Sequence, residues 1–128
     1  MASKDIEKSM GADEKRALET IRKVYEDGFM EINGRRYSMT SYTHKERRKV
    51  FAFFTSVQDQ LKKKDFSFLD SPKFSEVEGV LETHTLFNDS TLSNIGAHWD
   101  KYPGDYLMFI TTSLAVVSYP FTGAGATG

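Results

Sequence analysis

Apolar positions near the start of the chain repeat at helical spacing. They lie at intervals of three and four residues over 13–25, which places them on one side of an α-helix: Ala17, Leu18, Ile21, Val24 and Tyr25. Asp13 and Glu14 suit the positive end of the helix dipole. Gly28 follows the last apolar position and fits the left-handed residue that ends many helices. The pattern predicts an amphipathic helix that ends before Gly28.

The pattern changes to alternation over residues 29–39, on both sides of Asn33-Gly34. Asn-Gly favours a two-residue type I′ turn, because both central residues need positive φ. Pairing across the turn sets three residues opposite three others: Ile32 opposite Arg35, Glu31 opposite Arg36, and Met30 opposite Tyr37. One face then carries Met30, Ile32, Tyr37 and Met39, and the other carries an opposite-charge pair. The segment predicts a β-hairpin.

Two further helices have clear start signals. Thr43 and Glu46 match a capping box at the start of a helix that we expect to reach about Lys63. Its apolar arc contains Val50, Phe54, Val57 and Leu61, with Phe51 and Phe53 on either side. Ser71-Pro72 begins the next helix, with Pro72 at the first helical position. Its predicted buried side consists of Phe74, Val77, Val80, Leu81 and Phe87, and residues 88–90 end it.

The last third predicts a short helix over 92–98 and a longer, almost wholly apolar helix over 106–117, which Pro120 ends. Thr, Ile, Val and Tyr also suit strands, so two short strands are the alternative for 106–117. The expected fold is mainly α, a small helical domain with one short β-hairpin. We expect flexible tails at 1–11 and 121–128 and a single domain over 12–120.

Composition is consistent with one folded domain. The chain has 128 residues, is 39% hydrophobic and 13% aromatic, and can therefore form a core. It has no cysteine, which excludes a disulfide framework and fits a reducing compartment. Residues 1–11 lack the apolar region of a secretory signal, and no apolar run approaches the roughly 20 residues that span a bilayer. A cytoplasmic protein without a membrane partner is expected.

The net charge of −1 hides a strong partition. Residues 35–64 contain nine Lys/Arg and two Asp/Glu, a net of +7, whereas residues 65–128 have a net of −6. Such a partition favours oriented association with another copy or a charged partner, although both blocks also fit solvated faces of one domain. The candidate partner-binding residues are Arg35, Arg36, Lys45, Arg47, Arg48 and Lys49. Arg47 differs from the rest because it projects near the apolar arc, where its stem can cover the core.

No motif predicts catalysis, a metal or a cofactor. The histidines, at positions 44, 84 and 98, are far apart and have no cysteines to complete a zinc site. No nucleophile motif accompanies them, and the glycines match neither a P-loop nor a dinucleotide fingerprint. Clustered Lys and Arg can neutralise phosphates, so a nucleic-acid-binding accessory protein is the alternative. The slightly acidic chain and the lack of a helix-turn-helix, RNP or zinc-finger pattern argue against it.

The order of these features resembles one known family. A short helix precedes the hairpin segment INGRRYSM, which is followed by THKERRKVFAFF, a long helix, a Phe-rich loop and further helices. This arrangement is similar to the tail assembly chaperones of long-tailed, lambda-like bacteriophages. The resemblance covers roughly residues 13–120 and is most specific over 29–57.

The resemblance implies a mainly helical protein without enzymatic activity, acting in the host cytoplasm. Members of the family coat and solubilise the tape measure protein before the tail tube polymerises. A longer product, made by a programmed ribosomal frameshift near the end of the gene, recruits tail tube protein. Many copies side by side, in a spiral or array, would suit a long amphipathic helix. A subunit of a non-phage complex without catalysis is a further alternative.

Overall fold

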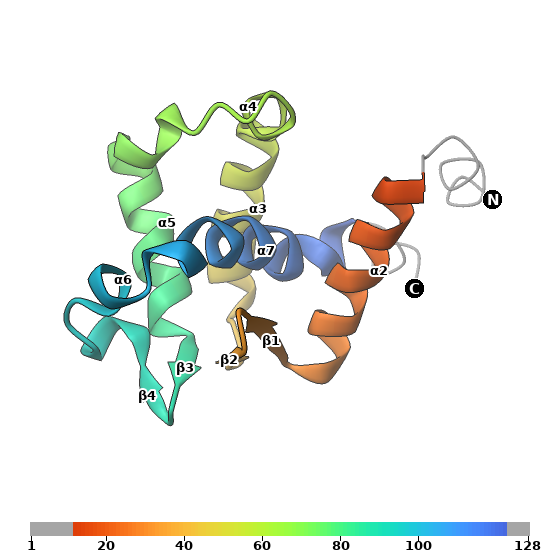
Figure 1. Ribbon diagram of the computed structural model, residues 1–128. Coiled ribbons are helices and arrows are strands. Elements are labelled where there is room, and N and C mark those ends of the chain that lie inside the picture. The colour runs from red at the N-terminus through yellow and green to blue at the C-terminus, as the bar shows by residue number, and fades with distance from the viewer. Residues whose placement is uncertain (1–11, 123–128) are drawn as a thin grey trace.

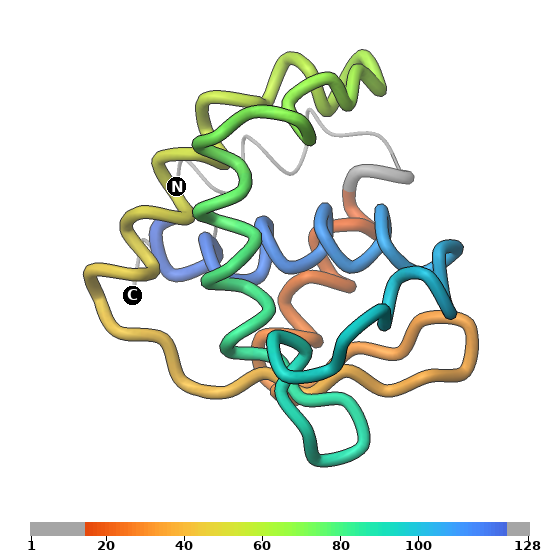
Figure 2. Tube along the Cα trace, turned by 90° about the vertical axis from the view of Figure 1, so that its left-hand side faces the viewer, coloured from red at the N-terminus to blue at the C-terminus, as the bar shows by residue number. Residues whose placement is uncertain are grey.

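Helix α7 (Tyr106–Ser118) crosses the middle of the molecule and packs against helices α3 (His44–Ser56) and α2 (Ala12–Asp27) (Figure 1). These elements belong to a computed structural model, which describes residues 12–122. Helix α5 (Pro72–Thr83) runs beside α3, and α7 crosses both (Figure 2). The shorter helical elements are α4 (Gln58–Lys62), α6 (His98–Lys101), and four 3-10 turns: η1 (Ser67–Asp70), η2 (Leu92–Asn94), η3 (Pro103–Asp105) and η4 (Tyr119–Phe121). The mainly α fold with a short hairpin, predicted from the sequence, is confirmed.

The predicted hairpin is present in the predicted register. Strands β1 (Phe29–Ile32) and β2 (Arg35–Met39) pair antiparallel, with Met30 opposite Tyr37 and Ile32 opposite Arg35. Both turn residues have positive φ, 51° at Asn33 and 80° at Gly34, as a type I′ turn requires. Met30, Ile32 and Tyr37 are buried on the predicted inner face, where Met39 is partly buried. Pattern and turn chemistry therefore agree with the structure.

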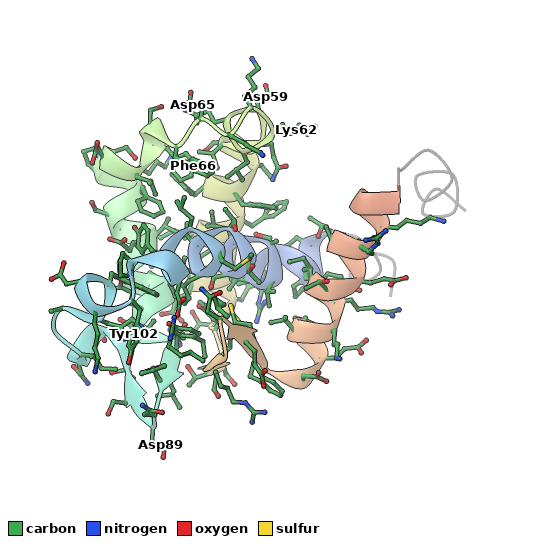
Figure 3. The ribbon with its side chains drawn as sticks, viewed as in Figure 1. Asp59, Lys62, Asp65, Phe66, Asp89 and Tyr102 are labelled. Atoms are coloured by element: carbon green, nitrogen blue, oxygen red, sulfur yellow. The ribbon has the colours of Figure 1, made fainter. Side chains whose placement is uncertain are left out.

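The sheet is larger than the sequence predicted. Strands β3 (Thr85–Phe87) and β4 (Ser90–Thr91) form a second hairpin, and the four-stranded antiparallel sheet has the order β1-β2-β3-β4. The expected helix over 72–87 instead ends at Thr83, and Phe87 belongs to β3. Asn88 and Asp89 both have positive φ, 51° and 67°, so this pair forms a turn where the sequence predicted only a helix stop. Asp89 lies at the tip of this second hairpin (Figure 3).

The long helix predicted from Thr43 to Lys63 is two helices. Its start is confirmed, because the Thr43–Glu46 capping box forms in both directions. It ends at Ser56, and Val57 separates it from α4 with φ −110° and ψ 11°. Thr55, Ser56 and Gln58 each donate a side-chain hydrogen bond to a carbonyl oxygen of the preceding turn. Such bonds compete with helical hydrogen bonding, which explains why the helix breaks here.

Two other helix boundaries follow their signals closely, whereas the helix expected over 92–98 does not form as one element. Gly28 has φ 81° and donates its backbone N–H to Val24 at 2.8 Å, so it is the predicted left-handed residue after α2. Ser71 accepts from the Phe74 N–H at 3.1 Å and caps α5. Residues 92–98, expected to form one helix, are divided between η2 and the start of α6, with Ala97 at φ 60° between them.

The core lies where α3, α5 and α7 meet. Phe53, Phe68 and Phe74 form an aromatic cluster with ring centroids 5.5–5.7 Å apart. Helix α7 contributes fully buried apolar side chains, among them Phe109, Ile110 and Leu114. The predicted tail at 1–11 and residues 123–128 of the predicted tail at 121–128 lie outside the described residues. Phe121, placed in the C-terminal tail from the sequence, closes η4 with its ring 5.0 Å from that of Phe51.

Candidate partner-binding surface

Arg35 is held inside the molecule's own hydrogen-bond network. Its guanidinium makes two bonds to the Asp105 carboxylate, from Nε at 2.6 Å and from an Nη at 2.9 Å, and it stacks on the Tyr102 ring. The Asp105 side chain is fully buried and also accepts from Asn33 Nδ2 at 2.7 Å. The hydrogen bonds from Arg35, together with those from Tyr37 and Asn33, hold the pKa of Asp105 well below its usual range. Arg35 therefore ties the first hairpin to the turn before α7.

Tyr37 extends this network to His98. The Tyr37 hydroxyl donates to Asp105 Oδ2 at 2.7 Å and lies 3.0 Å from His98 Nε2. Because that hydroxyl has one proton, which goes to Asp105, His98 Nε2 must be the donor in the second bond. Burial lowers the pKa of His98, so the ring is held in its neutral form, protonated at Nε2. The Tyr37, His98 and Asp105 side chains are all buried, which fits a structural role for this part of the network.

Arg36 and Lys49 also pair within the chain. Arg36 lies 3.5 Å from Glu31, its predicted cross-strand partner, and stacks on the Phe29 ring. Both members of this pair are exposed, so its stabilising effect is small. Lys49 forms an ion pair with Glu76 and thereby links α3 to α5.

Two of the six candidate cations remain free at the surface. Lys45 and Arg48 are exposed on the first turns of α3, and neither has an ion-pair partner among residues 15–122. Cations near a helix N-terminus oppose its dipole, and here no internal contact compensates. They are the exposed members of the predicted set that have no ion-pair partner within the described residues.

Arg47 lies at a pocket between four elements. It donates to the Val117 carbonyl oxygen at 2.7 Å, near the end of α7. The guanidinium carbon is 5.6 Å from the Tyr42 ring centroid and 6.0 Å from that of Tyr25. The sequence placed Arg47 beside the apolar arc, and its half-buried position agrees with that expectation.

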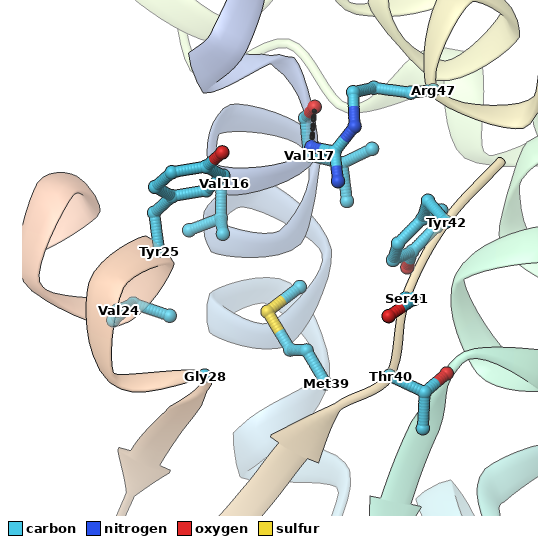
Figure 4. Close-up of a pocket in the computed structure, with 10 residues that line it drawn as sticks. All are labelled: Val24, Tyr25, Gly28, Met39, Thr40, Ser41, Tyr42, Arg47, Val116 and Val117. Atoms are coloured by element: carbon cyan, nitrogen blue, oxygen red, sulfur yellow. Dashed lines mark hydrogen bonds between the residues drawn. The ribbon is translucent and has the colours of Figure 1, made fainter. Parts of the chain in front are cut away.

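The pocket beside Arg47 has a volume of about 150 Å³. Val24 and Tyr25 of α2 form one wall, Tyr42 and Arg47 the opposite wall, and Met39 and Val116 lie between them (Figure 4). The Tyr42 hydroxyl is buried and has no hydrogen-bond partner, and burial raises its pKa. Sequence reasoning did not find this pocket, because its lining comes from segments that are up to about 90 residues apart.

Among the described residues, three large apolar side chains are exposed outside the core. Leu107 is 42% exposed and Met108 is 56% exposed, both in the first turn of α7, and Tyr25 is 41% exposed at the rim of the pocket. The sequence did contain a signal for the exposure of Leu107 and Met108. A helix that is apolar all round must expose some of its side chains unless every face is covered. The sequence prediction instead placed the whole helix in the core.

Several further titratable groups are engaged in contacts between elements. His84 joins three segments: Nε2 lies 2.9 Å from Glu46, Nδ1 lies 3.1 Å from the Thr40 hydroxyl, and the ring packs on Tyr42. The Thr43 backbone N–H, with help from His84, lowers the pKa of Glu46 to about 2. Trp99 donates to Glu82 at 2.9 Å, and the Tyr106 hydroxyl donates to Glu78. Burial raises the pKa of Glu82.

Among the described residues, no three His, Asp or Glu side chains gather in a way that could hold a metal ion. Within residues 12–122, each helix is too short or too polar to cross a bilayer.

The chain matches no protein-family model, and it matches no curated protein and no solved structure. The geometry of the described residues is therefore the basis for a functional proposal, together with the resemblance noted in the sequence.

Proposed function

We propose that this protein is a phage tail assembly chaperone, which binds and solubilises the tape measure protein. The observation that supports this most directly is the exposed apolar pair Leu107 and Met108 on a helix whose opposite side forms the core. A tape measure protein is a long amphipathic helix, and such helices bind by laying their apolar stripe against an apolar surface. Methionine suits this role because its flexible side chain adapts to varied partners.

The other parts of the proposal follow from the family resemblance. The protein acts in the host cytoplasm without catalysis, and copies assemble side by side along the tape measure helix. A longer frameshift product carries the extension that recruits tail tube protein. The nucleic-acid alternative has less support than the sequence suggested, because Arg35, Arg36 and Lys49 pair with carboxylates of the same chain.

Co-expression with the tape measure protein tests the proposal. In the double variant Leu107→Gln/Met108→Gln, side-chain size is nearly kept but the apolar surface is lost. We expect this variant to recover much less soluble tape measure protein than wild type. A matched control is Glu19→Gln/Lys23→Gln, which changes two exposed residues of α2 to the same amide.

Circular dichroism of each variant separates a binding defect from a folding defect. The control should recover as much soluble tape measure protein as wild type. If the folded Leu107/Met108 variant does so too, this surface is not the binding site and the proposed function loses its main support.

A further inference from the structure

The pocket beside Arg47 contains polar groups whose hydrogen-bonding capacity is unused. A guanidinium has five N–H donors, and Arg47 uses one of its nitrogens for the Val117 carbonyl oxygen. No carboxylate lies within ion-pair distance of Arg47 in the part of the chain that the structure describes. The charge is half-buried beside two aromatic rings, so an anion entering here would meet a weakly hydrated cation.

A second unused group lies in the same wall. The Tyr42 hydroxyl is buried and lacks a hydrogen-bond partner, whereas buried hydroxyls in folded proteins usually have one. It lies next to Ser41, another residue that lines the pocket (Figure 4). Because the Tyr42 oxygen has almost no accessible surface, it stays inside the wall. Arg47 is the charged donor that borders the space, whose other lining includes apolar Val24, Met39 and Val116 and polar Thr40 and Ser41.

We propose that this pocket receives one apolar side chain of a partner polypeptide together with an adjacent carboxylate, which pairs with Arg47. The apolar side chain contacts Val24, Met39 and Val116, and the exposed Tyr25 ring covers it at the rim. The identity of the partner, an acidic segment of the tape measure protein, rests on the proposed function. The chemistry of the pocket does not depend on that identity.

The size of the pocket favours a single side chain. Its volume of about 150 Å³ is below the roughly 300–1,000 Å³ of ordinary small-molecule sites. An apolar cavity of about this volume accommodates one benzene ring. A bare phosphate has no apolar part to place against Val24, Met39 and Val116, and one guanidinium is a weak phosphate site. A side chain with a neighbouring carboxylate uses both the apolar and the charged parts.

Small probes of this chemistry test the pocket directly by NMR. We would titrate the isotope-labelled full chain with 3-phenylpropionate, with the uncharged 3-phenylpropanamide, and with inorganic phosphate. We expect 3-phenylpropionate to shift the methyl signals of Val24, Met39 and Val116 and the Nε–H signal of Arg47. The amide should bind about tenfold more weakly, because it loses the charge-assisted bond to the guanidinium. Phosphate should leave the three methyl signals unchanged.

Matched variants assign the preference to Arg47. Arg47→Gln should remove the preference for the carboxylate over the amide, and Arg47→Lys should retain part of it. Arg48→Gln removes the same charge from the next residue, which does not line the pocket, and should behave as wild type. If Arg47→Gln does not fold, Arg47→Lys still decides the matter, because it keeps the charge but loses the planar guanidinium.

Two results would overturn the pocket proposal: equal affinity for acid and amide in the wild type, or equal effects of the Arg47 and Arg48 variants. Tighter binding of phosphate than of 3-phenylpropionate would overturn it as well, in favour of a phosphate site. The co-expression assay remains separate, because it depends on Leu107 and Met108. If the co-expression assay fails but the pocket binds 3-phenylpropionate as expected, the pocket proposal stands with a different polypeptide as partner. If the co-expression assay succeeds but the pocket does not bind, the pocket proposal is wrong and the proposed function stands.

Discussion

Asp105 is a buried carboxylate that holds together parts of the chain about 70 residues apart. Taking this charge out of water is costly, and three donors from the first hairpin offset the cost: Asn33, Arg35 and Tyr37. Removing the charge leaves the Arg35 guanidinium without its main partner. The network therefore fixes the position of the hairpin relative to α7.

Asp105→Asn should lower the free energy of unfolding by about 2–3 kcal/mol at neutral pH. This loss is smaller than for a fully buried ion pair, because solvent reaches the partly exposed Arg35. The folded pKa of Asp105 is depressed, so its contribution is fully present above the unfolded value of about 3.9. As pH falls below that value, the unfolded chain binds a proton that the folded chain does not, and the contribution is lost. Urea unfolding between pH 7 and 2.5 would measure this. A gap between wild type and variant that stays constant down to pH 2.5 would contradict the proposed ionised network.

At the scale of single residues, the sequence predicted contacts between neighbouring segments well and contacts between distant segments poorly. The register of Glu31 and Arg36 follows from the turn type alone, and their ion pair is present. Arg35 was assigned to a partner surface, because nothing in its neighbourhood indicates that Asp105 folds back onto it. Phe87 was assigned to the buried face of a helix, because it lies at helical spacing from the apolar residues before it. An apolar residue at that position also suits a short strand, and the spacing does not distinguish the two.

At the scale of elements, α7 combines two environments in one helix. Leu114 is fully buried, whereas Leu107, two turns earlier, is 42% exposed. The sequence predicted the helix from a run that is apolar almost all round, but it could not show which part the neighbouring helices cover. Likewise, the helix after Thr43 breaks at Val57 through side-chain hydrogen bonds that residue spacing does not reveal.

Leu114→Ala should lower the free energy of unfolding by about 2–5 kcal/mol, because it leaves a cavity in the core. Leu107→Ala removes the same atoms from an exposed site and should change it by only about 0.5 kcal/mol. Urea denaturation of both variants measures the difference. Similar losses for the two would show that the first turn of α7 is covered in solution.

Two glycines with open space around them test the first hairpin and α5. A Cβ added at Gly34 or Gly79 would meet no atom within 4 Å, so packing does not decide either substitution. Gly34 has φ 80°, and Gly34→Ala should cost about 1–2 kcal/mol. Gly79 lies inside α5, and Gly79→Ala should instead stabilise by about 0.5–1 kcal/mol. Thermal melts of both variants would show shifts of opposite sign, and a destabilised Gly79→Ala would contradict the helix assignment there.

At the scale of the whole molecule, the charge blocks of the sequence do not form two separate faces. Arg35 pairs with Asp105 and Lys49 with Glu76, so cations of the +7 block meet carboxylates of the −6 block within one chain. Asp59, Asp65 and Lys62 lie together at the α4 end of the molecule, far from Asp89 (Figure 3). Electrostatic attraction between copies is therefore weaker than the block charges suggest, and it depends on the cations that remain free.

Lys45 and Arg48 are the free cations of the predicted set, so they should dominate any charge-driven array. If copies assemble side by side, self-association should weaken as salt rises from about 50 to 500 mM, because exposed charges are screened. Lys45→Glu/Arg48→Glu should weaken self-association at low salt and remove most of this salt dependence. The folded monomer should not suffer, since Glu near the start of α3 suits the helix dipole. Sedimentation velocity over a concentration series measures both effects.

The matched control is Lys62→Glu/Lys63→Glu, which makes the same charge change on exposed residues at the far end of the same block. Equal effects of the two double variants would mean that net charge, and not the surface at the start of α3, governs assembly.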